Sequence, residues 1–265
     1  MSKKNLYYNK EIKDTKHLFR VLGISNKTLT SEQKKSLNKN GFAIFAPTKN
    51  ILDKLKKLKN ISKKLIKKEG KKGGWEGKEK YYKKGKLFDE GANRLGNLIE
   101  KNKIYRDIIL VPEILASAYE VIKHDIKLGG FDLRDPFKNK GEQGIHIDWL
   151  PRKNKRDSFN GVVCFIYLDD VNLKNGPTRI IPRSHKVLGW PNEHIDKFKI
   201  HKDEVKITGP AGTFVVMNLN LWHAGSKNIS GNSRKALFLD IRRRNLSQLL
   251  NFKKYLSKKI RTFLR

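Results

Sequence analysis

Cysteine is nearly absent from this sequence. Cys164 is the one cysteine in 265 residues, which excludes an intramolecular disulfide and a zinc site built from cysteines. It lies in the apolar run from Val162 to Leu168, where a small core residue is expected. No apolar stretch is long enough to be the core of a signal peptide or a membrane span. We therefore expect a soluble, cytoplasmic protein.

Acidic residues are also scarce. The chain has 26 Asp and Glu against 59 Lys and Arg, a formal net charge of +33. The positive electrostatic field of such a chain would attract nucleic acid, phosphates or anionic lipid. Alternatively, the lysines only solvate the outer faces of helices, and their placement along helix faces favours this second interpretation. A hydrophobic fraction of 37% excludes a wholly disordered polycation, and the length suits one domain of ordinary size.

The first half of the chain carries helical signals. Residues 1–28 have weak periodicity and many charges, so they are predicted to form a loosely ordered lead-in. Thr30 and Gln33 have the spacing of a capping box, which predicts the start of a helix. The remaining patterns predict the end of that helix at Asn40-Gly41, a strand over 42–45, an amphipathic helix over 51–70, a second helix over 111–123, and a flexible, lid-like loop over 71–86.

The second half is rich in short apolar runs separated by turn signals. This pattern predicts a mainly β fold with flanking helices, in the form of an antiparallel sandwich or barrel of the jelly-roll type. Residues 29–241 are predicted to form a single domain, and residues 242–265 a basic amphipathic C-terminal helix. The clearest predicted strands are Gly161–Leu168, Thr178–Ile181, Gly212–Asn220 and Ala236–Ile241.

A His-x-Asp triplet, His146 and Asp148, is the most informative local motif. In an extended strand, residues two apart point to the same side, so these two side chains can reach one point in the interior. A surface pair in a solvated loop would show the same triplet, so the motif alone is not specific.

His223 and Arg234 supply the second part of the pattern. A strand ending at His223, followed by a turn and a returning strand from Arg234, would place the two on neighbouring strands. Two neutral imidazoles and one carboxylate form a facial triad that suits non-haem Fe(II) and leaves positions open for a bidentate ligand and oxygen. The planar guanidinium of Arg234 suits a second carboxylate on that ligand.

With the segment from Asn175 to His185 between them, these residues resemble the phytanoyl-CoA dioxygenase family of Fe(II)- and 2-oxoglutarate-dependent oxygenases. The resemblance runs from about Leu29 to Ile241 and implies a double-stranded β-helix, a cupin-like jelly roll. One departure is Arg183, where the family usually has glycine. The family's roles then imply iron ligands at His146, Asp148 and His223, and 2-oxoglutarate contacts at Arg234, Gln143 and Thr178.

The resemblance also implies the reaction. Halogenating relatives replace the metal-binding carboxylate with a small residue, so Asp148 favours hydroxylation, in which 2-oxoglutarate and O2 become succinate and CO2. We expect a small or mid-sized, anionic substrate, with Arg134 and Trp149 as candidate contacts. The alternative is a basic jelly-roll protein that binds nucleic acid or an anionic surface and keeps a vestigial metal site; nucleic acid is not favoured. The oligomeric state is left open.

Overall fold

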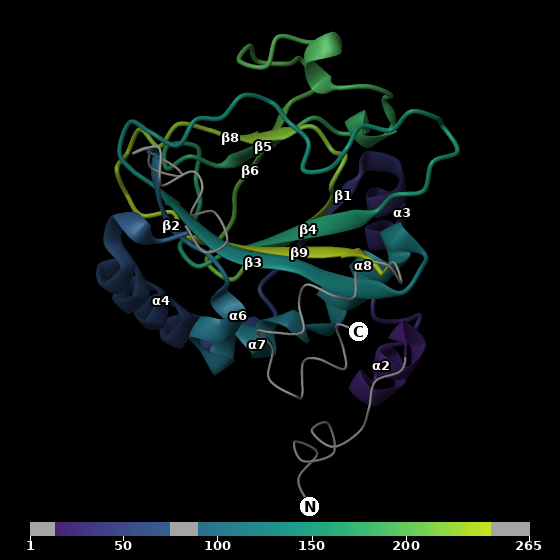
Figure 1. Cartoon of the computed structure of the whole chain (residues 1–265), viewed down its shortest axis with the longest axis horizontal. Coiled ribbons are helices and arrows are strands. Elements are labelled where there is room, and N and C mark those ends of the chain that lie inside the picture. The colour runs from purple at the N-terminus through teal and green to yellow at the C-terminus, as the bar shows by residue number, and fades with distance from the viewer. Residues whose placement is uncertain (1–13, 75–89, 245–265) are drawn as a thin grey trace, which may run out of the picture.

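Two antiparallel sheets face one another in the computed structural model, which describes residues 14–74 and 90–244 (Figure 1). The larger sheet has the order β1 (Phe42–Phe45), β7 (Phe214–Asn218), β4 (Gly161–Tyr167), β9 (Ala236–Arg243), β3 (Ile126–Pro136) and β2 (Ala92–Leu95). The smaller has the order β6 (Val205–Ile207), β5 (Thr178–Ile180) and β8 (His223–Gly225). The fold is the predicted jelly roll.

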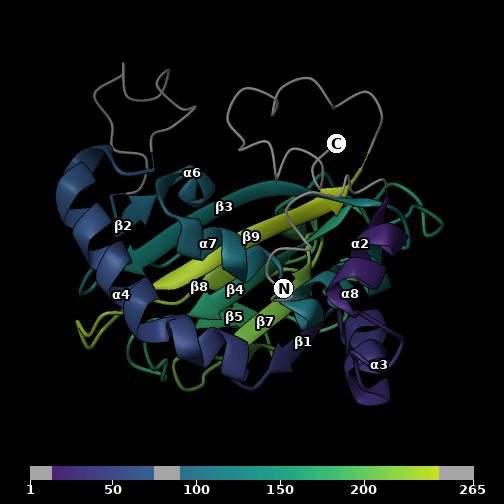
Figure 2. The ribbon, with the colours of Figure 1, turned by 90° about the horizontal axis from the view of Figure 1, so that it is seen from below.

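Helices cover the outer face of the larger sheet (Figure 2). They are α2 (Thr15–Leu22), α3 (Ser31–Asn40), α4 (Lys49–Glu69), α6 (Leu98–Lys101), α7 (Lys103–Ile109) and α8 (Pro112–Ile122). The predicted capping box is present on α3, where the Gln33 amide donates to Thr30 Oγ1 and the Thr30 amide donates to Gln33 Oε1. Gly41 ends this helix with a φ of 88°, a conformation that favours glycine.

Strand β4 is buried on both faces, which explains its unbroken apolar run. Val162, Cys164 and Ile166 pack into the core beneath the helices. Val163, Phe165 and Tyr167 pack into the layer between the two sheets. Cys164 is therefore the core residue that its neighbours predict.

Several predicted boundaries change. The segment 14–28 is not a loose lead-in, because α2 begins at Thr15, where Asp14 accepts a hydrogen bond from the His17 amide. Strand β3 was not predicted, since its Gly129-Gly130 pair and its charges disguise the alternation. Strand β9 continues to Arg243, beyond the predicted boundary at 241. Residues 245–265 of the C-terminal helix predicted over 242–265, and most of the predicted loop over 71–86, lie outside the described residues.

Helix α4 has the predicted amphipathic character. Ile51 and Leu58 are fully buried, whereas its outer face carries exposed lysines at 56, 57, 63, 64, 67 and 68. Across residues 14–74 and 90–244, no helix combines the length and the apolar character needed to cross a bilayer.

His185 gives the fold a pH-dependent stability. It is 1% exposed, and burial, with Lys186 and Arg152 nearby, lowers its pKa to about 4. The unfolded chain therefore takes up a proton first as pH falls below about 6.5. We expect the free energy of unfolding to decrease by about 2 kcal/mol on this account between pH 7 and pH 5.

Urea unfolding at both pH values, for the wild type and His185→Gln, measures this contribution. The variant should lose less stability than the wild type on acidification, whereas His124→Gln, a change at an exposed histidine, should behave like the wild type. Parallel pH profiles for all three proteins would contradict the assignment.

Candidate active site

His146 and His223 lie directly opposite one another across a backbone bridge. The His146 amide donates to the His223 carbonyl at 3.0 Å, and the His223 amide donates to the His146 carbonyl at 3.1 Å. The strand expected around His146 is thus a single bridge beside the first residue of β8. A third hydrogen bond, from the Asp148 amide to the Leu219 carbonyl at 2.9 Å, fixes the carboxylate beside both rings.

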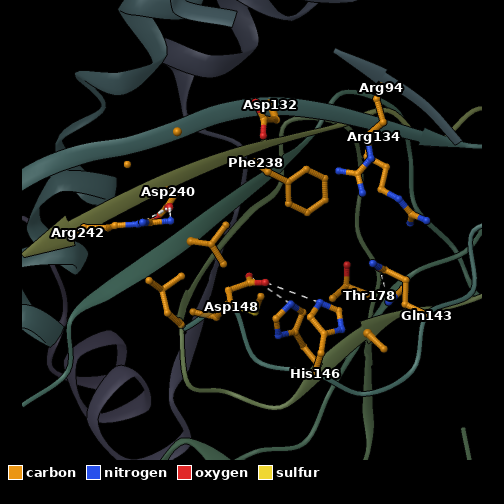
Figure 3. Close-up of a pocket in the computed structure, with 18 of the residues that line it drawn as sticks. Arg94, Asp132, Arg134, Gln143, His146, Asp148, Thr178, Phe238, Asp240 and Arg242 are labelled. Atoms are coloured by element: carbon orange, nitrogen blue, oxygen red, sulfur yellow. Dashed lines mark hydrogen bonds and ion pairs between the residues drawn. The ribbon is translucent and has the colours of Figure 1, made fainter. Parts of the chain in front are cut away.

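The side chains of His146, Asp148 and His223 converge. The two Asp148 oxygens lie 3.7 Å from His146 Nε2 and 3.4 Å from His223 Nε2, and one ligand atom from each residue lies within 4.8 Å of the others (Figure 3). Two ligands held at right angles about 2.1 Å from a metal lie about 3 Å apart. The observed spacing is close to what one ion requires.

The tautomers of the two imidazoles also suit a metal. His146 Nδ1 lies 2.9 Å from the Gly144 carbonyl and His223 Nδ1 lies 2.9 Å from the Leu221 carbonyl. A carbonyl only accepts, so each Nδ1 carries a proton, and in the neutral form of each ring Nε2 presents a lone pair toward Asp148. Burial lowers the pKa of His146 to about 4, with His223 adding to the effect and Asp148 opposing it. This donor set of two neutral nitrogens and one carboxylate fits Fe(II).

Arg234 is buried at the same cavity. Its side chain is 1% exposed, and Nε and Nη1 have no hydrogen-bond partner among the described residues. Burial lowers its pKa to about 10, so the guanidinium is charged at neutral pH. A buried cation with unpaired donors is costly, and a carboxylate ligand would supply the missing acceptors.

Asp135 holds Arg234 in place. The Arg234 amide and the Ser233 hydroxyl both donate to Asp135 Oδ1, at 3.0 and 3.1 Å. The amide of the next residue, Lys235, donates to a second carboxylate, Asp169 Oδ2, at 3.0 Å. The two carboxylates thereby fix the residues that lead into β9.

A cavity of about 440 Å³ between the two sheets brings the predicted residues together. Gln143 reaches it from the loop before His146, and its Oε1 accepts from the Gly225 amide at 3.2 Å. Thr178 reaches it from the start of β5. The predicted residues that line it are Arg134, Gln143, His146, Asp148, Thr178, His223 and Arg234.

One expectation about placement is wrong. His223 lies on β8 of the smaller sheet, whereas Arg234 precedes β9 of the larger one. They face the same cavity from opposite sheets and are not on neighbouring strands. Trp149, predicted to contact the substrate, is not among the cavity-lining residues; its ring lies under the guanidinium of Arg242, 4.8 Å from the ring centre.

The cavity also has charged residues that the sequence did not single out. Along β9, Phe238, Asp240 and Arg242 share the cavity face, and Asp132 comes from β3 and Arg94 from β2 (Figure 3). Asp240 is the one polar residue of the predicted strand at 236–241, and this was the available signal, because its side chain must face the side of the strand opposite to Leu239 and Ile241.

A family model described as phytanoyl-CoA dioxygenase matches residues 40–236. The chain belongs to this family. Arg183, at the family's usual glycine position, adopts a φ of 71°, so the turn keeps the left-handed conformation that glycine favours. An ectoine dioxygenase from Stutzerimonas stutzeri (strain A1501) is 29% identical to this family member, over 41% of the chain and 42% of that relative. The chain thus aligns with about two fifths of the relative's length.

Solved structures share the fold of this phytanoyl-CoA dioxygenase family member. The 2-oxoglutarate-dependent carbocyclase SnoK from nogalamycin biosynthesis has a TM-score of 0.63 at 15% identity, over 88% of this chain and 87% of that one. Iron-bound EctD from S. alaskensis has a TM-score of 0.64 at 14% identity, over 83% and 79%. HygX from Streptomyces hygroscopicus, with nickel and 2-oxoglutarate, has a TM-score of 0.63 at 13% identity, over 81% and 87%.

Proposed function

We propose that this protein is an Fe(II)- and 2-oxoglutarate-dependent dioxygenase that hydroxylates an unactivated carbon of a small molecule. The observation that carries the proposal is the meeting, in one cavity, of two imidazole Nε2 atoms, the Asp148 carboxylate and a buried guanidinium with unpaired donors. Family membership over residues 40–236 supports it.

Each residue has a distinct part in this proposal. His146, Asp148 and His223 would hold the iron, and the Nδ1–H groups of the two histidines would keep donating to the Gly144 and Leu221 carbonyls. Arg234 would bind the distal carboxylate of 2-oxoglutarate, with Gln143 and Thr178 as polar neighbours. When bound, iron and 2-oxoglutarate supply the oxidation by O2, and succinate and CO2 are released.

The cavity bears on the size and charge of the substrate. Small-molecule sites span about 300–1,000 Å³, so a cavity of about 440 Å³ that also receives 2-oxoglutarate leaves room for a small molecule. Arg94 and Arg134 line it beside Arg234, which supports an anionic group on the substrate.

The proposal is tested by adding Fe(II) and 2-oxoglutarate to the protein without oxygen. We expect a weak visible charge-transfer band that is absent with succinate in place of 2-oxoglutarate and absent in His146→Ala. Admission of O2 should then yield succinate. If the wild type shows neither band nor succinate and instead shows salt-sensitive retention on RNA, the basic binding protein is the better description.

A further inference from the structure

The wall of the cavity formed by β9 carries a carboxylate that the proposed chemistry does not use. Leu237, Leu239 and Ile241 point into the core beneath the helices, whereas Phe238, Asp240 and Arg242 line the cavity. In register, Asp240 lies between Gly130 of β3 and Val163 of β4. Neither of these two cross-strand neighbours offers a polar side chain to Asp240.

The two oxygens of Asp240 differ in their surroundings. Oδ2 accepts from Arg242 Nε at 2.6 Å and also contacts Arg242 Nη2. Oδ1 is buried and has no hydrogen-bond partner among the residues that the structure describes. An unpaired buried acceptor costs about 1–3 kcal/mol, so an arrangement kept only for stability would not be expected to leave this oxygen without a donor.

The Asp240–Arg242 pair is held from two sides. The larger sheet has a bulge between Leu128 and Gly130, and a Cβ at Gly129 would lie 2.6 Å from Asp240 Oδ2 and 2.7 Å from Arg242 Nε. On the other side, the Arg242 guanidinium lies over the Trp149 ring. Trp149 thus packs against the Arg242 side of the pair.

The lining as a whole argues against an acyl chain as the substrate. Seven charged side chains line the cavity: Arg94, Asp132, Arg134, Asp148, Arg234, Asp240 and Arg242. A hydrocarbon chain would desolvate this lining without offering a donor to Asp240 Oδ1. A small molecule with a donor group would offer one.

We propose that Asp240 is a specificity-determining residue whose Oδ1 accepts a hydrogen bond from an ammonium or hydroxyl group of the substrate. This inference rests on the proposed dioxygenase function, because it places the substrate in the same cavity. A site built to pair with a donor rejects an analogue that lacks it, by far more than a missing methylene would cost. Asp240 would thus select donor-bearing substrates and hold them against the β9 wall.

Three series of small carboxylic acids test the proposal, matched in chain length and different in the terminal group. They are ω-amino, ω-hydroxy and ω-methyl carboxylates of three to seven carbons. Binding to the full-length protein is measured by calorimetry without oxygen, with and without Fe(II) and 2-oxoglutarate. We expect at least one donor-bearing acid to bind the wild type at least tenfold more tightly than its methyl analogue. Asp240→Leu should bring the ratio within about twofold, and Asp240→Asn should weaken the amino acid more than the hydroxy acid.

Gly129→Ala and Gly130→Ala form a matched pair that leaves the charge of Asp240 in place. The added methyl at Gly129 meets the Asp240 carboxylate, whereas nothing lies within 4 Å of a Cβ at Gly130. Donor preference should fall in the first variant and persist in the second, which keeps the test informative if Asp240→Leu fails to fold.

Equal binding of all probes to the wild type, no binding of any, or a donor preference that survives in Asp240→Leu would overturn the proposal. The charge-transfer band is read in the same samples. Loss of the band with donor preference intact would count against the dioxygenase function and not against Asp240.

Discussion

Replacing Asp148 with glycine is expected to abolish turnover of 2-oxoglutarate to succinate. Asp148 is the only carboxylate beside the two imidazole Nε2 atoms within the described part of the chain, and its amide is tied to the Leu219 carbonyl. Without it, two neutral nitrogens remain, and the iron would lose its anionic ligand. We expect a decrease in rate of ~1,000-fold or more, which corresponds to about 4 kcal/mol of transition-state stabilisation.

Succinate release at saturating Fe(II) measures this effect, and excess metal separates weak binding from lost chemistry. Asp203→Gly is the matched control, because Asp203 is exposed and lies in a loop outside the cavity lining. The control should retain wild-type turnover. Full activity in Asp148→Gly would show that the carboxylate is not a ligand.

Replacing Arg234 with methionine is expected to raise the KM for 2-oxoglutarate by about 100-fold or more, since two charge-assisted hydrogen bonds of about 1.5–3 kcal/mol each are lost. The same change should leave the free protein at least as stable as the wild type. A methionine of similar volume needs no acceptor, whereas the buried guanidinium has two nitrogens without partners in the described structure.

Arg234→Lys provides the comparison, since it keeps the charge but not the planar fork; an intermediate KM is expected. The two readouts are the KM for 2-oxoglutarate and the midpoint of thermal unfolding. A methionine variant that unfolds at a much lower temperature and keeps its KM would assign Arg234 to the fold and not to the cosubstrate.

Local sequence signals predicted much of this molecule because they act over a few residues. The capping box at Thr30, the stripe of α4 and the apolar run of β4 each encode their own element. Strand β3 was not predicted, because its bulge at Gly129 and the placement of its charged residues depend on its pairing with β9. Helix α2 was missed although it carries local signals: Asp14 caps its first turn and Gly23 ends it with a φ of 70°.

The candidate site was likewise predicted from the sequence only in part. The spacing of His146, Asp148, His223 and Arg234 indicated which residues would meet, because the chemistry of a facial triad restricts the residue types. It did not indicate that His223 and Arg234 face one another from different sheets. Nor could it place Trp149 under Arg242, since that contact joins a loop to a strand more than ninety residues away.

The order of residues alone therefore determined most of the element types, the members of the proposed metal-binding set and the family. Only the tertiary structure decided which other charges share the cavity, because strand register and the bulge at Gly129 place Asp240 and Arg242 on its wall. The physical reason is the distance along the chain over which each feature is specified. Helix caps and periodic apolar faces depend on residues close in sequence, whereas a cavity wall forms only after strands distant in sequence have paired.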